Sequence, residues 1–158
     1  MSEVKLVGNN PFLNNLKIEV TEISDGKRFV NDDGVMLPEI TKVEYKTHLH
    51  VFTRDKNYRS TIDKLTVAGK SLYLYIQSRL EPSDDFIEIN KDNYLKTNNV
   101  KSIITYRKAV NDLIDNNIII KMGTYQNVFW VNPHFLFCGS RINKFPKNLI
   151  VKSEVNKL

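Results

Sequence analysis

The side chains best suited to a defined chemistry lie in one stretch of the chain, between residues 100 and 115. Basic, hydroxyl and amide groups recur there at the spacing of a helical face, opposite an apolar stripe. Serine, threonine and lysine side chains bond phosphates, and arginine and asparagine can read base edges. The stretch therefore predicts a helix that binds nucleic acid. Its predicted exposed face carries Lys101, Thr105, Lys108 and Asp112, flanked by Ser102, Arg107 and Asn111.

The charge of this helix is distributed unevenly along its axis. The first two turns are basic, with Lys101, Arg107 and Lys108, and the last turn is acidic, with Asp112 and Asp115. Insertion of the N-terminal half of the helix into a groove of DNA suits that polarity. The alternative is a solvated helix without a ligand, because three basic and two acidic residues leave a net charge of only +1.

A second set of polar residues lies in a predicted hairpin that follows this helix. Two short β-branched and aromatic runs, 118–121 and 128–131, flank the turn-rich segment 123–127. The loop of such a hairpin can reach the backbone or the minor groove of DNA. The hairpin residues predicted to contact DNA are Lys121, Tyr125, Gln126 and Asn127.

The elements that position these residues follow from the period of the apolar side chains. From residue 61 they recur at helical spacing, which predicts one helix of about 18 residues, capped by Ser60 or Thr61. Asn116-Asn117 suits the left-handed conformation that ends a helix. Three helices and a small sheet in this order predict an α+β winged helix-turn-helix. The other predicted elements are a strand over 85–90, a helix over 91–97 and a helix over 100–115.

The first 60 residues have a different pattern. Apolar and polar residues alternate over 16–21 and again over 42–51, and turn-forming residues lie between the two runs. This alternation predicts short antiparallel strands. The predicted organisation is a β-rich N-terminal segment at 1–60, a winged-helix domain at 61–141 and a basic C-terminal tail at 142–158.

The excess positive charge lies at the C-terminal end of the chain. Residues 1–60 carry nine basic and nine acidic side chains, residues 61–117 carry eight of each, and residues 118–158 carry six basic and one acidic. A basic segment can face nucleic acid or an acidic protein surface, or it can be a solvated tail. Arg141 and Lys144 complete the set of residues predicted to contact DNA.

Other reactive side chains do not form a catalytic or metal site by pattern. His48 and His50 lie at i and i+2 on a predicted strand, with Glu44 as the nearest further ligand, and exposed strand positions are favoured over zinc. The single cysteine, Cys138, suits a small buried side chain rather than a nucleophile. The sequence has no GxxxxGK[ST], GxGxxG or HExxH motif. It predicts a non-enzymatic protein without a cofactor or a metal ion.

The second half of the chain resembles a known protein family. The stretches 100–106, 112–119 and 129–141 carry the likeness, and Trp130 to Arg141 is its most specific part. Over residues 61–141 the chain resembles the RepL-type plasmid replication initiators. Residues 1–60 are not covered by this likeness.

The resemblance to this family implies a winged-helix protein that engages a plasmid origin and recruits host replication proteins without being an enzyme. Cys138 departs from the family pattern, which has a basic residue before the glycine. The resemblance places Lys101, Ser102, Thr105, Arg107 and Lys108 toward DNA. It gives structural roles to Trp130, Asn132, Pro133 and Phe135.

Two functions of different classes therefore remain open. The first is binding of double-stranded DNA by a replication initiator or a related regulator. The second is a structural or assembly protein of a phage particle that reuses the winged-helix fold, because a fold does not fix a function. The N-terminal strands and the C-terminal tail would then contact protein partners or further copies of the chain.

The sequence carries no pattern of export or membrane insertion. Residues 1–10 lack the apolar core of a signal peptide, and no stretch approaches the roughly 18 apolar residues of a membrane helix. We expect a cytoplasmic protein, or a virion component if it is an assembly protein, and no membrane partner.

Overall fold

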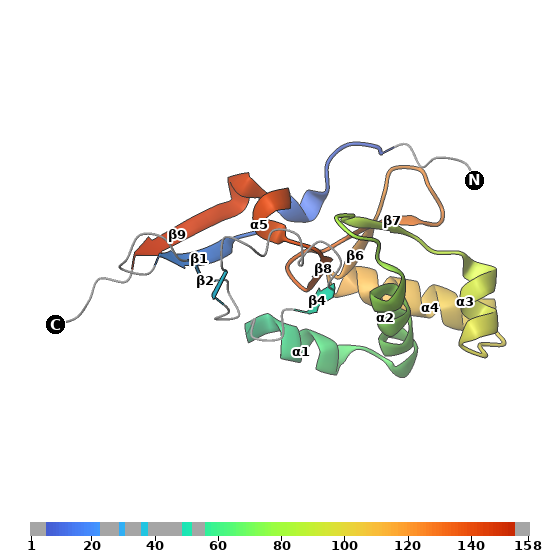
Figure 1. Cartoon of the computed structure of the whole chain (residues 1–158). Helices are drawn as coiled ribbons and strands as arrows, with labels where there is room; N and C mark the ends of the chain where they lie inside the picture. Colours follow the sequence, from blue (N-terminus) through green and yellow to red (C-terminus); the bar gives the residue numbers. More distant parts are fainter. Residues whose placement is uncertain (1–5, 23–28, 31–35, 38–48, 52–55, 154–158) are drawn as a thin grey trace.

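The computed structural model of the chain describes residues 6–22, 29–30, 36–37, 49–51 and 56–153 (Figure 1). Within these residues the chain is a mixed α+β protein. Helices pack on a small three-stranded antiparallel sheet, and strands from the two ends of the chain pair in another sheet. The α+β class predicted from the sequence is confirmed.

The central unit runs in the order helix, strand, helix, helix, strand, strand, as expected from the pattern of residues. Its three strands form an antiparallel sheet in the order β5-β7-β6. The hairpin between the last two strands spans residues 122–127. The elements are α2 (Val67–Arg79), β5 (Phe86–Glu88), α3 (Lys91–Thr97), α4 (Ile103–Asp115), β6 (Ile119–Lys121) and β7 (Val128–Val131).

Strand β7 is the centre of this sheet and is buried on both faces. Phe129 and Val131 point into the core formed with α2 and α4, while Val128 and Trp130 pack with Met122 on the opposite face. A strand usually alternates between buried and solvent-exposed side chains. The burial of all four β7 residues shows that both faces of this small sheet are covered.

Helices α2 and α4 pack against each other over the main core. Leu72 and Ile76 of α2 and Leu113 of α4 are fully buried there. Three tyrosine rings of this core pack against one another. The ring of Tyr94 lies 5.2 Å from that of Tyr75 and 5.6 Å from that of Tyr106, in edge-on and tilted arrangements that aromatic pairs favour.

The single helix predicted from residue 61 onward is wrong. The chain forms α1 (Lys56–Lys64) and α2, with a break at Leu65 and Thr66. Thr66 caps α2, since its Oγ1 accepts a hydrogen bond from Gly69 N at 3.1 Å. A carboxylate oxygen of Asp112, on α4, accepts from Thr66 N and from Thr66 Oγ1, each at 2.8 Å. The start of α2 is therefore fixed by hydrogen bonds with a residue that is distant in the sequence.

The observed bounds of α4 agree with the prediction at its C-terminal end only. The helix begins at Ile103 rather than near residue 100, because Ser102 caps it and accepts from Ile104 N at 3.2 Å. At the other end Asn117 adopts a left-handed conformation with φ of 57°, as predicted. The N–H of Ile118 then donates to the carbonyl of Leu113 at 2.9 Å, which ends the helix.

The two ends of the chain meet in a second sheet with the order β3-β2-β1-β9. Strand β9 pairs in parallel with β1, so that Ile18 lies opposite Leu149. A further pair joins β4 to β8, with Leu49 opposite Cys138. The remaining elements are η1 (Pro11–Asn14), β1 (Ile18–Glu22), β2 (Phe29–Val30), β3 (Met36–Leu37), β4 (Leu49–Val51), β8 (Leu136–Cys138), α5 (Arg141–Lys144), η4 (Pro146–Asn148) and β9 (Leu149–Ser153).

These pairings change how the ends of the chain are interpreted. The boundary predicted at residue 60 falls inside α1, and the boundary predicted at residue 141 falls inside α5. Residues 149–153 are a strand of a sheet rather than a solvated tail. The predicted strand over 42–51 is described only at its end, as β4, and the predicted turns at 25–26 and 31–34 lie outside the described residues.

The N-terminal residues 6–10 are attached to the three-stranded sheet through Asn10, which is 2% exposed. Its Nδ2 donates to Asp85 Oδ2 at 3.0 Å and to Val131 O at 2.9 Å, and its Oδ1 accepts from Phe12 N at 3.1 Å. A Cβ added at Gly123, in the hairpin, would lie 3.1 Å from Val7 Cγ1. The segment therefore contacts both the sheet and the hairpin loop.

We expect Asn10→Ala to lower the free energy of unfolding by about 2 kcal/mol, measured by urea denaturation. The substitution leaves the buried carboxylate of Asp85 without one of its partners, and an unsatisfied buried acceptor costs about 1–3 kcal/mol. Asn9→Ala is the matched control because Asn9 is exposed, and its effect should stay within about 0.5 kcal/mol. Equal effects of the two substitutions would contradict the anchoring role of Asn10.

We expect Gly69→Ala to destabilise the protein by about 1–3 kcal/mol, although glycine to alanine in a helix normally stabilises by roughly 0.5–1 kcal/mol. The added Cβ would overlap Asp112 Oδ2, the atom that holds the start of α2. In an Asp112→Ala background the same substitution should become stabilising. A stabilising Gly69→Ala in the otherwise unchanged protein would show that the contact with Asp112 is not tight.

Candidate nucleic-acid interface

The exposed face of α4 is set by its packing on α2 and the sheet. Tyr106, Ala109, Val110 and Leu113 are the buried residues of this helix. Residues at i, i+3, i+4 and i+7 share one face of a helix, and one such set in α4 is exposed throughout. This outer face consists of Ile104, Arg107, Lys108 and Asn111.

The outer face differs from the one predicted by spacing. Lys108 is exposed, as expected, but Thr105 and Asp112 are half-buried on the side of the helix that faces α2. Asp112 binds Thr66 instead of facing solvent. The prediction for Thr105 and Asp112 is therefore wrong, because spacing alone does not reveal how far a neighbouring helix covers each side of α4.

A groove of about 420 Å³ lies between α4, the start of α3 and the hairpin of β6 and β7. Three elements each contribute one basic residue to it: Lys91 from α3, Arg107 from α4 and Lys121 from β6. Polar amides line it as well. The full lining is Lys91, Ile103, Tyr106, Arg107, Val110, Asn111, Lys121, Gln126, Asn127 and Phe129.

The side chains that line the groove carry a net positive charge. The residues of the described chain that line it include three basic side chains and no carboxylate. Burial raises the pKa of Tyr106, and the neighbouring Tyr75 and Tyr94 raise it further, so this phenol is neutral near pH 7. Two acidic side chains interact with residues of the lining. Glu88 accepts from Asn127 Nδ2 at 2.8 Å, and Asp92 lies 3.9 Å from Lys91 Nζ with its side chain 89% exposed, which makes a weak, screened pair.

The structure brings together five of the residues predicted to contact DNA. They come from two elements and one loop that are separate in the sequence, and they share the groove with Lys91. Lys91 was missed, since the sequence shows it only as the first residue of a short helix after its Asn90 cap. The five predicted residues are Arg107, Asn111, Lys121, Gln126 and Asn127.

Four other predicted residues lie outside the groove lining. Lys101 is exposed just before α4. Ser102 is half-buried, and its Oγ accepts the hydrogen bond that caps the helix, so it acts in helix capping. Lys108 is exposed on the outer face of α4. Tyr125 is half-buried, packs against the cluster of Met122, Val128 and Trp130 and does not line the groove.

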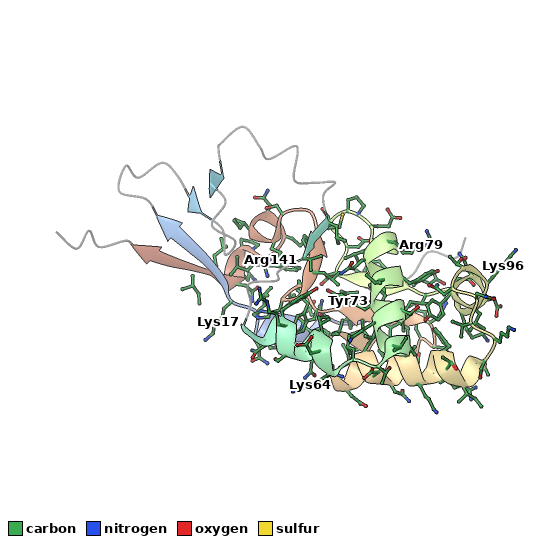
Figure 2. All side chains as sticks on the ribbon, turned by 90° about the horizontal axis from the view of Figure 1, so that it is seen from below. Lys17, Lys64, Tyr73, Arg79, Lys96 and Arg141 are labelled. Carbon is green, nitrogen blue, oxygen red and sulfur yellow. The ribbon has the colours of Figure 1, made fainter. Side chains whose placement is uncertain are left out.

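Neither of the two predicted contacts in the C-terminal part lines the groove. Arg141 is 6% exposed, and its Nη1 donates to Pro133 O at 2.9 Å, so the prediction that it binds DNA is wrong. Figure 2 shows Arg141 near the middle of the molecule and Lys96, at the end of α3, at one edge of it. Lys144 is exposed, but it lies on α5, where its charge opposes the rise that burial causes in the pKa of Asp84.

Cys138 is buried, with 5% of its surface exposed, as predicted. It lies on β8 opposite Leu49 of β4. Burial, and secondarily the charge of Glu81, raises the pKa of its thiol. The thiol is therefore protonated near neutral pH and is a poor nucleophile.

No cluster of three or more metal-binding side chains lies among the described residues. His48 and the side chain of His50 lie outside them, so the zinc alternative at these histidines is not addressed by the structure. The longest helices in the described part of the chain, α2 and α4, have 13 residues each, and no described helix has the length and apolar character to cross a membrane.

No protein-family model matches this chain, and no curated protein or solved structure is significantly similar to it. The resemblance to the RepL-type initiators stays a prediction from the sequence.

We expect Cys138 in the native protein to react with a thiol reagent such as DTNB at least about tenfold more slowly than in the protein unfolded in guanidinium chloride. The reason is that its thiol is both buried and protonated. The measurement is the rate of release of the coloured thiolate at pH 8. Equal rates in the two states would contradict the packing of β8 against β4.

Proposed function

We propose that residues 61–141 form a winged helix-turn-helix that binds double-stranded DNA. Helix α4 enters the major groove, and the hairpin of β6 and β7 acts as the wing. The observation that carries this proposal is the groove between these two elements. It combines Lys91, Arg107 and Lys121 with amide side chains and holds no carboxylate among its described lining residues.

The dimensions of the elements suit this role. The major groove is about 12 Å wide, which admits one α-helix with its side chains. Helix α4 presents a continuous outer face, while its four buried side chains pack in the main core. The basic residues of that face, Arg107 and Lys108, lie before its midpoint, Lys101 precedes the helix, and Asp115 is exposed at the last turn. The helix therefore enters the groove with its N-terminal half.

The groove residues divide into two roles by chemistry. Lys91, at the start of α3, and Lys121, at the end of β6, line the groove beside α4, where each can bind a phosphate. Arg107 and Asn111 lie one helical turn apart on α4 and carry the side chains that read base edges. Gln126 and Asn127 of the wing supply further polar contacts.

The role of a replication initiator is part of this proposal and rests on the resemblance of residues 61–141 to the RepL-type initiators. On this proposal the protein is non-enzymatic, needs no cofactor and acts on DNA in the cytoplasm. Capture of a replication origin requires the DNA-binding face, so binding to DNA is the step to test first.

The first experiment measures binding of the full chain to mixed-sequence duplex DNA at about 50 and 200 mM salt. Each phosphate contact contributes about 0.9 to the slope of log affinity against log salt concentration. Two contacts would weaken binding about tenfold across this range. Lys91→Ala and Lys121→Ala should each lower the magnitude of the slope by about 0.9.

Lys96→Ala and Lys144→Ala are the matched controls. Lys96 lies on the same helix as Lys91 but outside the groove lining, and Lys144 is an exposed lysine of α5. Both should leave the slope unchanged. Absence of binding to duplex DNA even at low salt would overturn the proposal, and equal effects of Lys91→Ala and Lys96→Ala would overturn the assignment of the groove.

An assembly protein is the second candidate function, and the edge of the sheet favours it. Among the described residues β9 pairs on one side only, with β1, so its outer edge can accept a strand from another chain. Light scattering of the purified chain would test this. A defined oligomer that is lost when proline replaces Ile150, which is 37% exposed on β9, would support it, and a monomer at all concentrations would not.

A further inference from the structure

The exposed face of α4 carries apolar side chains at its first turn. Ile104 is 60% exposed and Ile103 is 39% exposed, whereas the four core residues of the same helix are each 8% exposed or less. Ile103 also lines the basic groove. Single exposed apolar residues are common on protein surfaces. Two neighbouring isoleucines beside the proposed base-reading residues are a more specific arrangement.

The position of the isoleucines relative to the polar residues is fixed by the helix. Ile104 precedes Arg107 by three residues and Asn111 by seven, so all three lie on the outer face. Ile103 lies on the side of that face toward the groove, which Lys121 also lines. The apolar atoms are therefore placed inside a basic surface. Charge complementarity favours a polyanion over an apolar protein helix as their partner.

We infer that α4 recognises A·T base pairs through the thymine methyl group, an inference that rests on the proposed binding of duplex DNA. In the major groove the C5-methyl of thymine is an apolar group that apolar side chains contact. Asparagine can pair with the N6 and N7 atoms of adenine, the partner of thymine. Ile104 and Asn111, about two helical turns apart, thus suit the thymine of one A·T pair and the adenine of another, and Lys91 and Lys121 hold the surrounding phosphates.

The test compares thymine with uracil, which differs from thymine in DNA only by the missing methyl. Duplexes that bind the full chain are first selected from a random pool, and the enriched sequence is then synthesised with either thymine or deoxyuridine at its A·T pairs. We expect A·T enrichment and about fourfold weaker binding of the uracil duplex for each methyl that is buried. The phosphate contacts and the hydrogen bonds of the bases are the same in both duplexes.

A variant of the protein shows whether α4 makes this contact. Ile104→Ala should weaken binding of the thymine duplex about fourfold and leave binding of the uracil duplex nearly unchanged. Leu74→Ala is the matched control, since Leu74 is 62% exposed but lies on the outer side of α2. It should change neither affinity. Because both side chains are exposed, neither substitution threatens the core.

The outcomes separate this inference from the proposed function. Binding to duplex DNA without an enriched sequence, or with equal affinity for thymine and uracil duplexes, overturns the inference and leaves DNA binding in place. A uracil effect that survives Ile104→Ala also overturns it. Failure to bind any duplex overturns the proposed function and this inference together.

Discussion

The burial of β7 on both faces is the constraint on which the other parts of the structure depend. Phe129 and Val131 belong to the core with α2 and α4, and Val128 and Trp130 belong to the cluster on the opposite face. A three-stranded sheet has a small surface area. Loss of the residues packed on either face of β7 would therefore expose its aromatic side chains to water. The position of the hairpin relative to α4 follows, because both strands of the hairpin belong to this sheet.

The groove is a consequence of that packing. Lys121 lies opposite Phe129 across the β6–β7 pair, and Phe129 is part of the groove floor below α4. Lys91 reaches the same groove because Asn90 caps α3 next to the end of β5, where Ile89 N donates to Asn127 O at 2.8 Å. Three charges that are far apart in the sequence are thus held by rigid elements rather than by loops, which limits the entropy that would be lost on binding a polyanion.

The N-terminal residues are part of the same arrangement. Asn10 satisfies the carboxylate of Asp85 and the carbonyl of Val131 at one end of the sheet, while Val7 contacts the hairpin loop at Gly123. The opposite end of the chain is tied in by β9, which pairs with β1, and by Asn148, whose Nδ2 donates to the carbonyls of Leu13 and Leu16. Residues outside 61–141 therefore belong structurally to the unit that carries the groove.

The sequence by itself determined the local elements and their order. Hydrophobic period predicted α4, β-branched and aromatic residues predicted β7, Asn117 marked a helix end, and residues 123–127 were assigned correctly to a loop between two strands. These features depend on interactions between residues close in the chain. The tertiary structure decided the rest. The Asp112–Thr66 contact divided the predicted first helix, and packing on α2 turned Thr105 and Asp112 away from solvent.

Partners distant in the chain also decided which predicted residues form the site. Arg141 is buried against Pro133 although its charge suggested exposure, and Lys91 joins Arg107 and Lys121 although nothing local relates them. Period and charge report which way a side chain faces only when the neighbouring element is known. The sequence could therefore indicate the helix and the hairpin that carry the site. The packing of β7, with one buried cluster on each face, decided that the charges of these elements lie in one groove.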